Sequence, residues 1–258
     1  MEFVRIGDGR NALAARDTER TMKDQVAVAA VIPCLDEEDA IAAVVTAVRA
    51  QGVAEVIVVD GGSRDRTVER ALSAGAKVVI ERQRGYGRAV QSGIAAASGD
   101  ADILLFLDGD GSDRVECIPA LIAPIAAGRA VFVTGSRTRG GRELGSLSLQ
   151  QVVAGRLAGL LVRVFYGVRF TDMSPFRAIR RDALDRLGMR EPTYGWNLEM
   201  LMRVAASGLP SLEIPVGQRR RAGGVSKVSG DLVSAIKAAA TLVSVFFRLA
   251  VTLRRQPH

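Results

Sequence analysis

Two aspartates on either side of one glycine end an apolar run of the chain. The stretch "LLFLDGDGSD", residues 104–113, contains Asp108, Gly109 and Asp110. Two carboxylates this close repel each other, and hard oxygen ligands of this kind suit Mg²⁺ or Mn²⁺. Asp and Gly are also common in ordinary turns. The pattern favours a divalent-metal site at a strand end, with a polar turn as the alternative.

The elements that must position this pair follow a βαβ rhythm. Apolar, β-branched runs alternate with stretches of helical period at 38–51 and 67–74. The runs are 26–33, 56–60, 77–80, 103–108 and 131–135. Near-continuous apolar strands are typical of a parallel sheet that is buried on both faces. We therefore expect an α/β fold that binds its ligand beyond the carboxyl ends of the strands.

The loops after these strands are polar or glycine-rich. They read "PCLDEED", "DGGSRDRT", "ERQRGYGRA", "DGDGSD" and "GSRTRG". The first loop lacks the Gly-x-Gly-x-x-Gly of a dinucleotide fold, and its acids would repel a pyrophosphate, which disfavours a Rossmann dehydrogenase. Gly85 and Gly87, beside Arg84 and Arg88, are suited to cradle an anion with backbone N–H groups.

Composition narrows the class of partner. The chain has 258 residues and a net charge of +7, which indicates an anionic partner. Only 5% of the residues are aromatic, and no basic run is interleaved with stacking side chains, so nucleic acid is disfavoured. Cys34 and Cys117 have no partner motif, which indicates a reducing compartment. Residues 1–25 mix acids and bases without an apolar block, so we expect a polar extension and a cytoplasmic protein.

The motifs, in this order, resemble those of family 2 glycosyltransferases with a GT-A fold. The likeness lies in "VIPCLDEED", "VIVVDGGSRDRT", "RGYGRAVQSGI", "LLFLDGDGSD" and "GSR". The later "DMSPFRAIRRDAL", "GWNLEM" and "GGVSKVSG" are similar to the branch of dolichyl-phosphate mannose synthase and bacterial polyprenyl-phosphate sugar synthases. Asp36 stands where that branch usually has asparagine, and "GWNLEM" lacks the Glu-Asp pair of hydroxyl-glycosylating relatives. The likeness implies a polar extension (1–25), a GT-A domain (26–230) and a C-terminal amphipathic helix (231–258).

The resemblance also assigns residues to a nucleoside-diphosphate sugar, UDP- or GDP-linked. Those for the nucleotide and its phosphates are Pro33, Leu35, Glu37, Asp60, Gly85, Arg88, Asp108 and Gly109. Asp60 would hydrogen-bond the base, and Asp108 would face the ribose or the metal. Asp110 would bind the Mg²⁺ or Mn²⁺ that bridges the diphosphate. For the first loop and Asp60, a capped strand-to-helix turn is the structural alternative.

Catalysis in such a family inverts the anomeric carbon in a single displacement. A metal at Asp110 would stabilise the leaving diphosphate as a Lewis acid. Arg137, in "GSR", would meet the donor diphosphate or an acceptor phosphate through its bidentate fork. A hydroxyl acceptor needs a general base. The only histidine is the terminal His258, which leaves Asp172 and Glu199 as candidates.

A phosphate acceptor removes the need for that base. Its second pKa is near 6, so at neutral pH it is largely a dianion that requires cations. The segment "GQRRRAGGVSK" supplies Arg219, Arg220, Arg221, Ser226 and Lys227, although a solvated basic loop would look the same. The single tryptophan, Trp196, is expected to stack on a sugar or to pack in the core.

Two arginine-punctuated apolar stretches suggest contact with lipid. They are 147–170 and 235–255, and neither offers the uninterrupted run of a membrane span. Both are able to lie in the interface with arginines reaching the headgroups, or to pack on the core as ordinary helices. We therefore expect a peripheral enzyme on the cytoplasmic face of a membrane that glycosylates a polyprenyl phosphate.

Other classes remain open at this level. A family 2 transferase acting on a soluble hydroxyl is one. A haloacid-dehalogenase-like phosphatase shares an Asp-x-Asp loop, but it carries that loop after the first strand. A sugar-nucleotide pyrophosphorylase opens with a glycine-rich, arginine-bearing loop, which "PCLDEED" is not. A non-catalytic subunit that binds nucleotide sugars completes the set. The sequence leaves open the sugar, the base, the lipid length and the oligomeric state.

Overall fold

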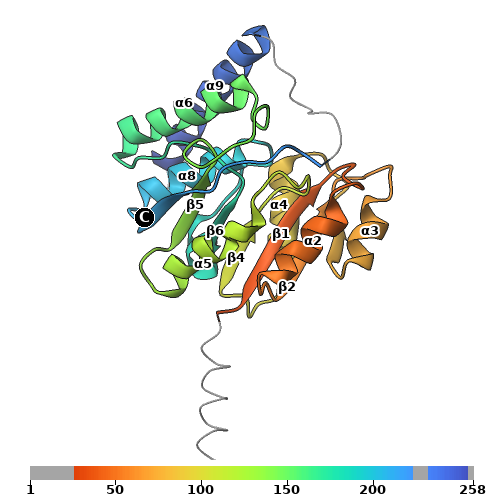
Figure 1. Ribbon diagram of the computed structural model, residues 1–258. Coiled ribbons are helices and arrows are strands. Elements are labelled where there is room, and N and C mark those ends of the chain that lie inside the picture. Colours follow the sequence, from red (N-terminus) through yellow and green to blue (C-terminus); the bar gives the residue numbers. More distant parts are fainter. Residues whose placement is uncertain (1–25, 223–231, 255–258) are drawn as a thin grey trace, which may run out of the picture.

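The computed structural model describes residues 26–222 and 232–254 (Figure 1). The strands are β1 (Val28–Cys34), β2 (Glu55–Asp60), β3 (Lys77–Ile80), β4 (Ile103–Phe106), β5 (Phe132–Ser136), β6 (Arg177–Arg180) and β7 (Ser211–Pro215). The helices are α2 (Ile41–Ala50), α3 (Thr67–Ser73), α4 (Tyr86–Ala96), α5 (Ile118–Ala126), α6 (Leu149–Tyr166), α7 (Arg181–Leu187), α8 (Trp196–Ala206) and α9 (Leu232–Arg254), with a 3₁₀ turn, η1, at Val115–Cys117. All five predicted strands and both predicted helices are present.

The seven strands form one sheet in the order β3-β2-β1-β4-β6-β5-β7. β6 runs antiparallel to both of its neighbours, β4 and β5, and the remaining pairs are parallel. This confirms the predicted mainly parallel α/β sheet. Since β1, β2, β4 and β5 run in one direction, the loops that follow them meet at one edge of the sheet.

Both faces of the sheet are buried. Ala29 and Val31 of β1 pack in a core formed with α4, α8, α6 and α9, whereas Ala30 and Ile32 pack with α2 and α5 on the other face. Figure 1 shows this arrangement, with the sheet between the two sets of helices. Because successive residues of a strand face opposite sides, a sheet covered on both sides selects a continuous apolar run.

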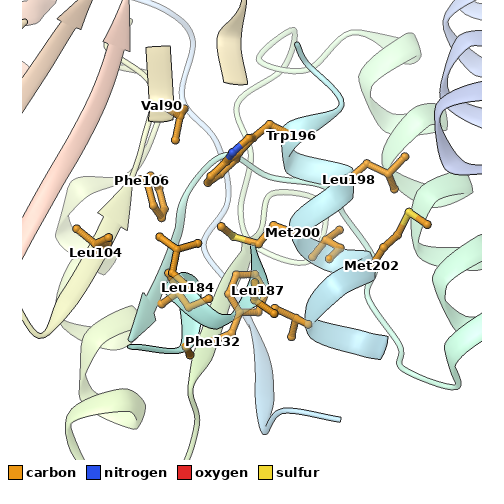
Figure 2. Packing of buried hydrophobic residues seen from close by; sticks show 14 of the residues in the cluster. Val90, Leu104, Phe106, Phe132, Leu184, Leu187, Trp196, Leu198, Met200 and Met202 are labelled. Atoms are coloured by element: carbon orange, nitrogen blue, oxygen red, sulfur yellow. The ribbon is translucent and has the colours of Figure 1, made fainter. Parts of the chain in front are cut away.

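Trp196 lies inside the first of these cores and is fully buried. Its ring meets Phe106 edge to face, with 5.2 Å between centroids, and Figure 2 shows it among the buried side chains of α8 and the sheet. This contradicts the expected stacking of Trp196 on a sugar or an acceptor. The alternative, core packing, is what the structure shows.

The two arginine-punctuated stretches form α6 and α9, which pack against each other. Ser148 and Gln151 form a capping box at the start of α6, and Gly167 ends it in a left-handed conformation. Phe165 of α6 contacts the rings of Phe246 and Phe247 of α9. The C-terminal helix is therefore packed on the body of the fold. No helix among the described residues is long and apolar enough to cross a membrane.

Candidate active site

The loop after β4 holds its two aspartates through short internal hydrogen bonds. The Asp108 amide donates to Asp113 Oδ2 (2.9 Å), and the Ser112 amide donates to Asp110 Oδ1 (2.8 Å). A Cβ at Gly109 would collide with Cys34 Sγ of β1, so only glycine lets the loop pass this strand. Asp110 and Asp113 are buried, and Asp108 is half-buried.

Negative charge is concentrated in this loop. Removal from water and the neighbouring Asp110 raise the pKa of Asp108 to about 7, against the opposing influence of Arg137 and Arg221. Burial and Asp108 also raise the pKa of Asp113. Carboxylates whose ionisation is this unfavourable gain from a bound cation.

The donor set fits a metal that is shared with a substrate. In the described part of the chain, no group of three or more Asp, Glu, His or Cys side chains is arranged to hold a metal alone. Mg²⁺ is commonly held by one or two carboxylates together with substrate phosphates. Asp108 and Asp110 supply that number of carboxylates at the edge where the fold binds ligands.

Residues 218–222 lie across this loop. The Ala222 amide donates to the Asp110 carbonyl (3.0 Å), and the Arg219 amide donates to the Ser112 carbonyl (2.9 Å). Arg221 Nε lies 2.8 Å from Asp110 Oδ2, and its Nη1 lies 3.7 Å from Glu37 Oε1. Arg221 thus stands beside the carboxylates expected to bind the metal.

The three consecutive arginines do not form one patch. Arg219 pairs with Glu116 (2.7 Å), whereas Arg220 Nε donates to the Leu144 carbonyl (2.7 Å). Each of the three guanidinium groups therefore has a different partner. Ser226 and Lys227, expected at the acceptor, lie outside the described residues.

The loops after β1 and β2 brace each other. Cys34 is in register with Asp60, so Pro33, Leu35 and Glu37 lie beside the start of the second loop. The Glu37 amide donates to Thr67 Oγ1 (2.8 Å). Asp60 is buried and accepts hydrogen bonds from the Gly62 amide (2.9 Å), the Ser63 amide (3.0 Å) and the Ser63 hydroxyl. Asp60 holds its own turn in the structure, and its contact with a base stays a prediction.

Asp36 lies in the same loop and is the one non-glycine residue in the described chain with a positive φ (54°). Its Oδ1 accepts the Arg64 amide (2.8 Å), and its own amide donates to Ser63 Oγ (2.9 Å). Asp and Asn are the side chains that tolerate this conformation best after glycine. The departure from asparagine at this position is therefore compatible with the loop.

Gly85 and Gly87 have a packing role that the sequence did not indicate. A Cβ at Gly85 would collide with the Pro192 carbonyl, and one at Gly87 with the Glu191 carbonyl. The Arg88 amide donates to the Pro192 carbonyl (3.1 Å), and its exposed side chain bonds Gln83. These glycines let the backbone at 191–192 approach α4, and the binding of an anion by this turn stays a prediction.

Arg137, at the end of β5, is buried in a bidentate pair with Asp172. Its Nε lies 2.8 Å from Oδ2 and its Nη2 lies 2.9 Å from Oδ1, and its amide donates to Oδ2 as well (2.9 Å). Burial alone raises the pKa of Asp172, but the Arg137 guanidinium outweighs it and keeps that pKa below the usual value. A carboxylate so paired is a poor proton acceptor, which argues against Asp172 as a general base.

Glu199 is also buried, and both of its carboxylate oxygens accept hydrogen bonds. It accepts the Glu191 amide (2.7 Å), the Arg190 amide (3.0 Å) and the Arg203 Nε (2.8 Å). These hydrogen bonds anchor the loop at residues 190–191 to α8, so Glu199 has a structural role. The geometry does not support the expected catalytic role. Its spacing of four residues from Arg203 on α8 is the sequence signal that fits this structural role.

Three residues without an assigned role in the sequence lie near Asp108. Arg177 is fully buried, donates to the carbonyls of Ser174 and Asn197, and has a pKa lowered to about 10 by burial. Tyr86 Oη is buried beside the Asn197 side chain, and a hydrogen bond from Asn197 and the nearby Asp108 both act on the pKa of the tyrosine. The motif "SPFR" carried the only sequence signal for Arg177.

The profile "Glycosyl transferase family 2" matches residues 29–188, more than half of the chain. The chain belongs to glycosyl transferase family 2. It is 38% identical over 212 residues to an uncharacterised glycosyltransferase of Mycobacterium tuberculosis (81% of this chain, 93% of the relative). It is 35% identical over 210 residues to the dolichyl-phosphate hexose transferase of Haloferax volcanii (80% and 87%).

The fold agrees with this membership. Glucosyl-3-phosphoglycerate synthase of Mycobacterium tuberculosis, crystallised with Mn²⁺, UDP-glucose and phosphoglyceric acid, superposes with a TM-score of 0.69 at 23% identity (96% of this chain, 86% of that one). The predicted GT-A fold and the predicted glycosyltransferase activity are thereby confirmed. The loops that follow β1, β2, β4 and β5 of this family 2 transferase lie at one sheet edge, as the βαβ rhythm predicted.

Proposed function

We propose that this family 2 transferase moves a sugar from a nucleoside-diphosphate sugar to a polyprenyl phosphate, with inversion at the anomeric carbon. The observation that carries the proposal is the pair Asp108 and Asp110 at the sheet edge, close to the buried Arg137. A relative adds support, since the similar protein of Haloferax volcanii is a dolichyl-phosphate hexose transferase. A neighbour of the same fold was crystallised with UDP-glucose and Mn²⁺.

Asp108 and Asp110 are the residues proposed to hold Mg²⁺ or Mn²⁺. The bound ion would supply Lewis-acid stabilisation of the leaving diphosphate. Arg221 already pairs with Asp110, so it competes with a cation for that carboxylate. Once displaced, this guanidinium is available to pair with a phosphate group.

Arg137 is the proposed cation for the phosphates of donor or acceptor. Its Asp172 pair fixes the direction of the guanidinium, and Arg137 is close enough to Asp108 to influence its pKa. A fixed fork costs less ordering at the moment of binding than a free surface arginine. Asp172 is therefore proposed as a positioning residue for Arg137.

A phosphate acceptor, which needs no general base, agrees with the ion pairing of Asp172 and Glu199, the two carboxylates considered as bases. Asp172 and Glu199 are both held in ion pairs, and neither offers an unoccupied basic oxygen to a hydroxyl. A phosphate monoester is largely dianionic at neutral pH and attacks without losing a proton. The acceptor oxygen then needs positioning and cations rather than a base.

The donor sugar is proposed to lie beside Asp108, Tyr86 and Asn197. Tyr86 Oη and Asn197 Oδ1 offer a donor and an acceptor to sugar hydroxyls. The loop with Pro33, Leu35 and Glu37 would hold the base and ribose. The acceptor lipid would be met at the cytoplasmic membrane surface through α6 and α9.

A panel of UDP- and GDP-sugars offered with polyprenyl phosphate, and separately with 3-phosphoglycerate and a soluble alcohol, tests the proposal. Mass spectrometry should detect a lipid-phosphate sugar for one donor, with loss of product in excess EDTA. Glycosylation of the soluble acceptor at a comparable rate, with polyprenyl phosphate ignored, would reject the lipid acceptor. Binding of nucleotide sugar without any turnover would indicate a binding subunit instead.

A further inference from the structure

A pocket of about 380 Å³ lies beside α6, apart from the carboxylate loop. Four arginines and two threonines line most of it: Thr138, Arg139, Arg156, Arg163, Arg169 and Thr171. Thr138 and Thr171 are the chain neighbours of Arg137 and Asp172, whose side chains pair with each other. The pocket is thus next to the proposed donor site but formed by different side chains.

The positive charge of this pocket is largely unneutralised. No carboxylate of the described residues lies within ion-pair distance of Arg156, Arg163 or Arg169. Arg139 alone pairs, with Glu213 at 3.6 Å, and that buried carboxylate already accepts two hydrogen bonds from Thr171. Guanidinium groups left in this state favour a multivalent oxyanion such as phosphate.

The helix geometry explains why the arginines converge. Arg156, Leu160 and Arg163 are spaced by four and three residues, so they share one side of α6. Gly159 lets the helix approach the Phe170 carbonyl, where a Cβ would collide. The backbone carrying Arg169 and Thr171 therefore forms a wall directly against the helix, and the pocket is built between two ordered segments.

Exposed apolar side chains lie along the side of α6 that also carries Arg156 and Arg163. Leu149, Val153, Leu160 and Val164 are 67%, 39%, 55% and 69% exposed. Their spacing of four, seven and four residues keeps them on one side of the helix. Phe247 and Val251 of the neighbouring α9 are about half exposed. Exposed apolar side chains would not increase the affinity of a site for a soluble anion. A helix that lies in a membrane interface combines arginines with exposed apolar residues in this way.

We propose that the pocket binds the phosphate of an anionic phospholipid headgroup while the exposed apolar side chains of α6 enter the acyl boundary. This headgroup is distinct from the polyprenyl phosphate that accepts the sugar. The inference rests on the membrane contact proposed above and names the surface and the lipid chemistry that produce it. Arg156, Arg163 and Arg169 supply charge complementarity, and Leu160 and Val164 supply the apolar contact.

Co-sedimentation with vesicles of phosphatidylcholine, with and without phosphatidylglycerol, tests the charge. The full-length triple variant Arg156→Gln/Arg163→Gln/Arg169→Gln should lose affinity for the anionic vesicles by about 100-fold, since each cation near such a surface contributes about fivefold. The matched control is Arg129→Gln, which removes one exposed charge in the turn before β5, at the opposite end of the sheet. If Arg163→Gln and Arg129→Gln weaken binding equally, the charge is non-specific and the pocket assignment is overturned.

A second variant separates a lipid from a free phosphate. Leu160→Ser/Val164→Ser should reduce binding to the same vesicles while keeping every arginine. If this variant binds as the wild type does and the triple arginine variant does not, the pocket recognises the phosphate without any apolar contact, no side chain of α6 enters the acyl boundary, and the lipid assignment fails.

A third measurement separates the headgroup from the acceptor. Transfer to a short, soluble polyprenyl phosphate in the absence of vesicles should be unchanged in the triple arginine variant. Impaired transfer would place the acceptor phosphate in the pocket and overturn the proposal. If the wild type transfers to no polyprenyl phosphate, the proposed function fails, yet the vesicle comparison still decides the pocket.

Discussion

Asp108 occupies a position that costs the folded chain stability whenever it is ionised. Its pKa is about 7 in the folded protein, because of removal from water and the nearby Asp110, whereas an unfolded aspartate has a pKa of about 3.9. Between these values the unfolded chain has lost the proton and the folded chain has kept it. Stability therefore falls as pH rises from about 4 to 7, and the deficit is complete above pH 7.

Asp108→Asn should raise the melting temperature of the metal-free protein at pH 8, and by less at pH 5, because the amide never ionises. A gain of a few degrees is expected, at about 2–4 °C for each kcal/mol in a protein of this size. Differential scanning fluorimetry at both pH values measures it. The control is Asp182→Asn, because Arg180 lowers the pKa of this exposed carboxyl to about 2, and its loss should not stabilise. A melting temperature of Asp108→Asn equal to that of the wild type at pH 8 would contradict the argument.

Asp110→Asn should fold and should lose transfer. The metal is proposed to join this carboxylate to the donor diphosphate, so Mn²⁺ should no longer tighten nucleotide binding in the variant. Isothermal titration of UDP and GDP, with and without Mn²⁺, measures this, with the wild type in EDTA as the reference. Wild-type transfer that survives excess EDTA would refute the metal assignment of Asp108 and Asp110.

At the scale of elements, residues 218–222 form a strap across the carboxylate loop. Arg221 Nε lies 2.8 Å from Asp110 Oδ2, where it competes with a metal ion for that oxygen. Arg221→Gln should therefore raise the affinity for Mn²⁺ in the absence of nucleotide several-fold, as measured by the signal of free Mn²⁺ in electron paramagnetic resonance. Arg220→Gln is the control, since Arg220 bonds the Leu144 carbonyl instead. Weaker Mn²⁺ binding by Arg221→Gln would mean that the arginine assists the site.

The start of α4 depends on a glycine at position 87. A Cβ there would collide with the Glu191 carbonyl, whereas a Cβ at Gly99 would meet nothing within 4 Å. Gly87→Ala should destabilise the protein by about 1–3 kcal/mol through forced backbone shifts. Gly99→Ala should be close to neutral. Urea denaturation of both variants measures the difference in the free energy of unfolding. Equal values would show that the backbone at residues 191–192 shifts to accommodate the methyl group without loss of stability.

For the whole molecule, the sequence predicted the sheet well where burial dictates composition. The largely buried strands β1, β2, β4 and β5 need continuous apolar runs, and all four were predicted; the run of β3 was predicted too, although that edge strand is only partly buried. β6, which begins and ends with arginine, and β7, with the alternating "SLEIP", lack that signature. Ligands of parallel α/β sheets bind beyond the carboxyl ends of the strands. The order of strands and loops in the sequence was therefore enough to predict which edge of the sheet carries the site.

Two of the residues whose structural roles the sequence did not establish have partners far away in the chain, and a third, Glu199, has its partners in a loop 8 and 9 positions before it. Gly87 meets Glu191, and Trp196 meets Phe106, across about 90 to 100 positions. Glu199 reads as a free carboxylate on a helix until the 190–191 amides are placed beside it. A linear pattern gives residue types and spacing, and such long-range neighbours are fixed only by the tertiary fold.

An ion pair between Arg248 of α9 and the buried Glu191, 2.6 Å long, joins the C-terminal helix to the loop that packs on α4. Glu191 presents its carbonyl to Gly87 at the start of α4, beside the proposed donor site, so the loop that carries Glu191 contacts both α9 and this helix. If a membrane surface and a nucleotide sugar both favour the same position of this loop, the two binding equilibria are coupled. Each ligand then strengthens the binding of the other by the same factor. Vesicle affinity measured with and without donor, and donor affinity measured with and without vesicles, should therefore change by one common ratio. Arg248→Gln should bring that ratio toward one.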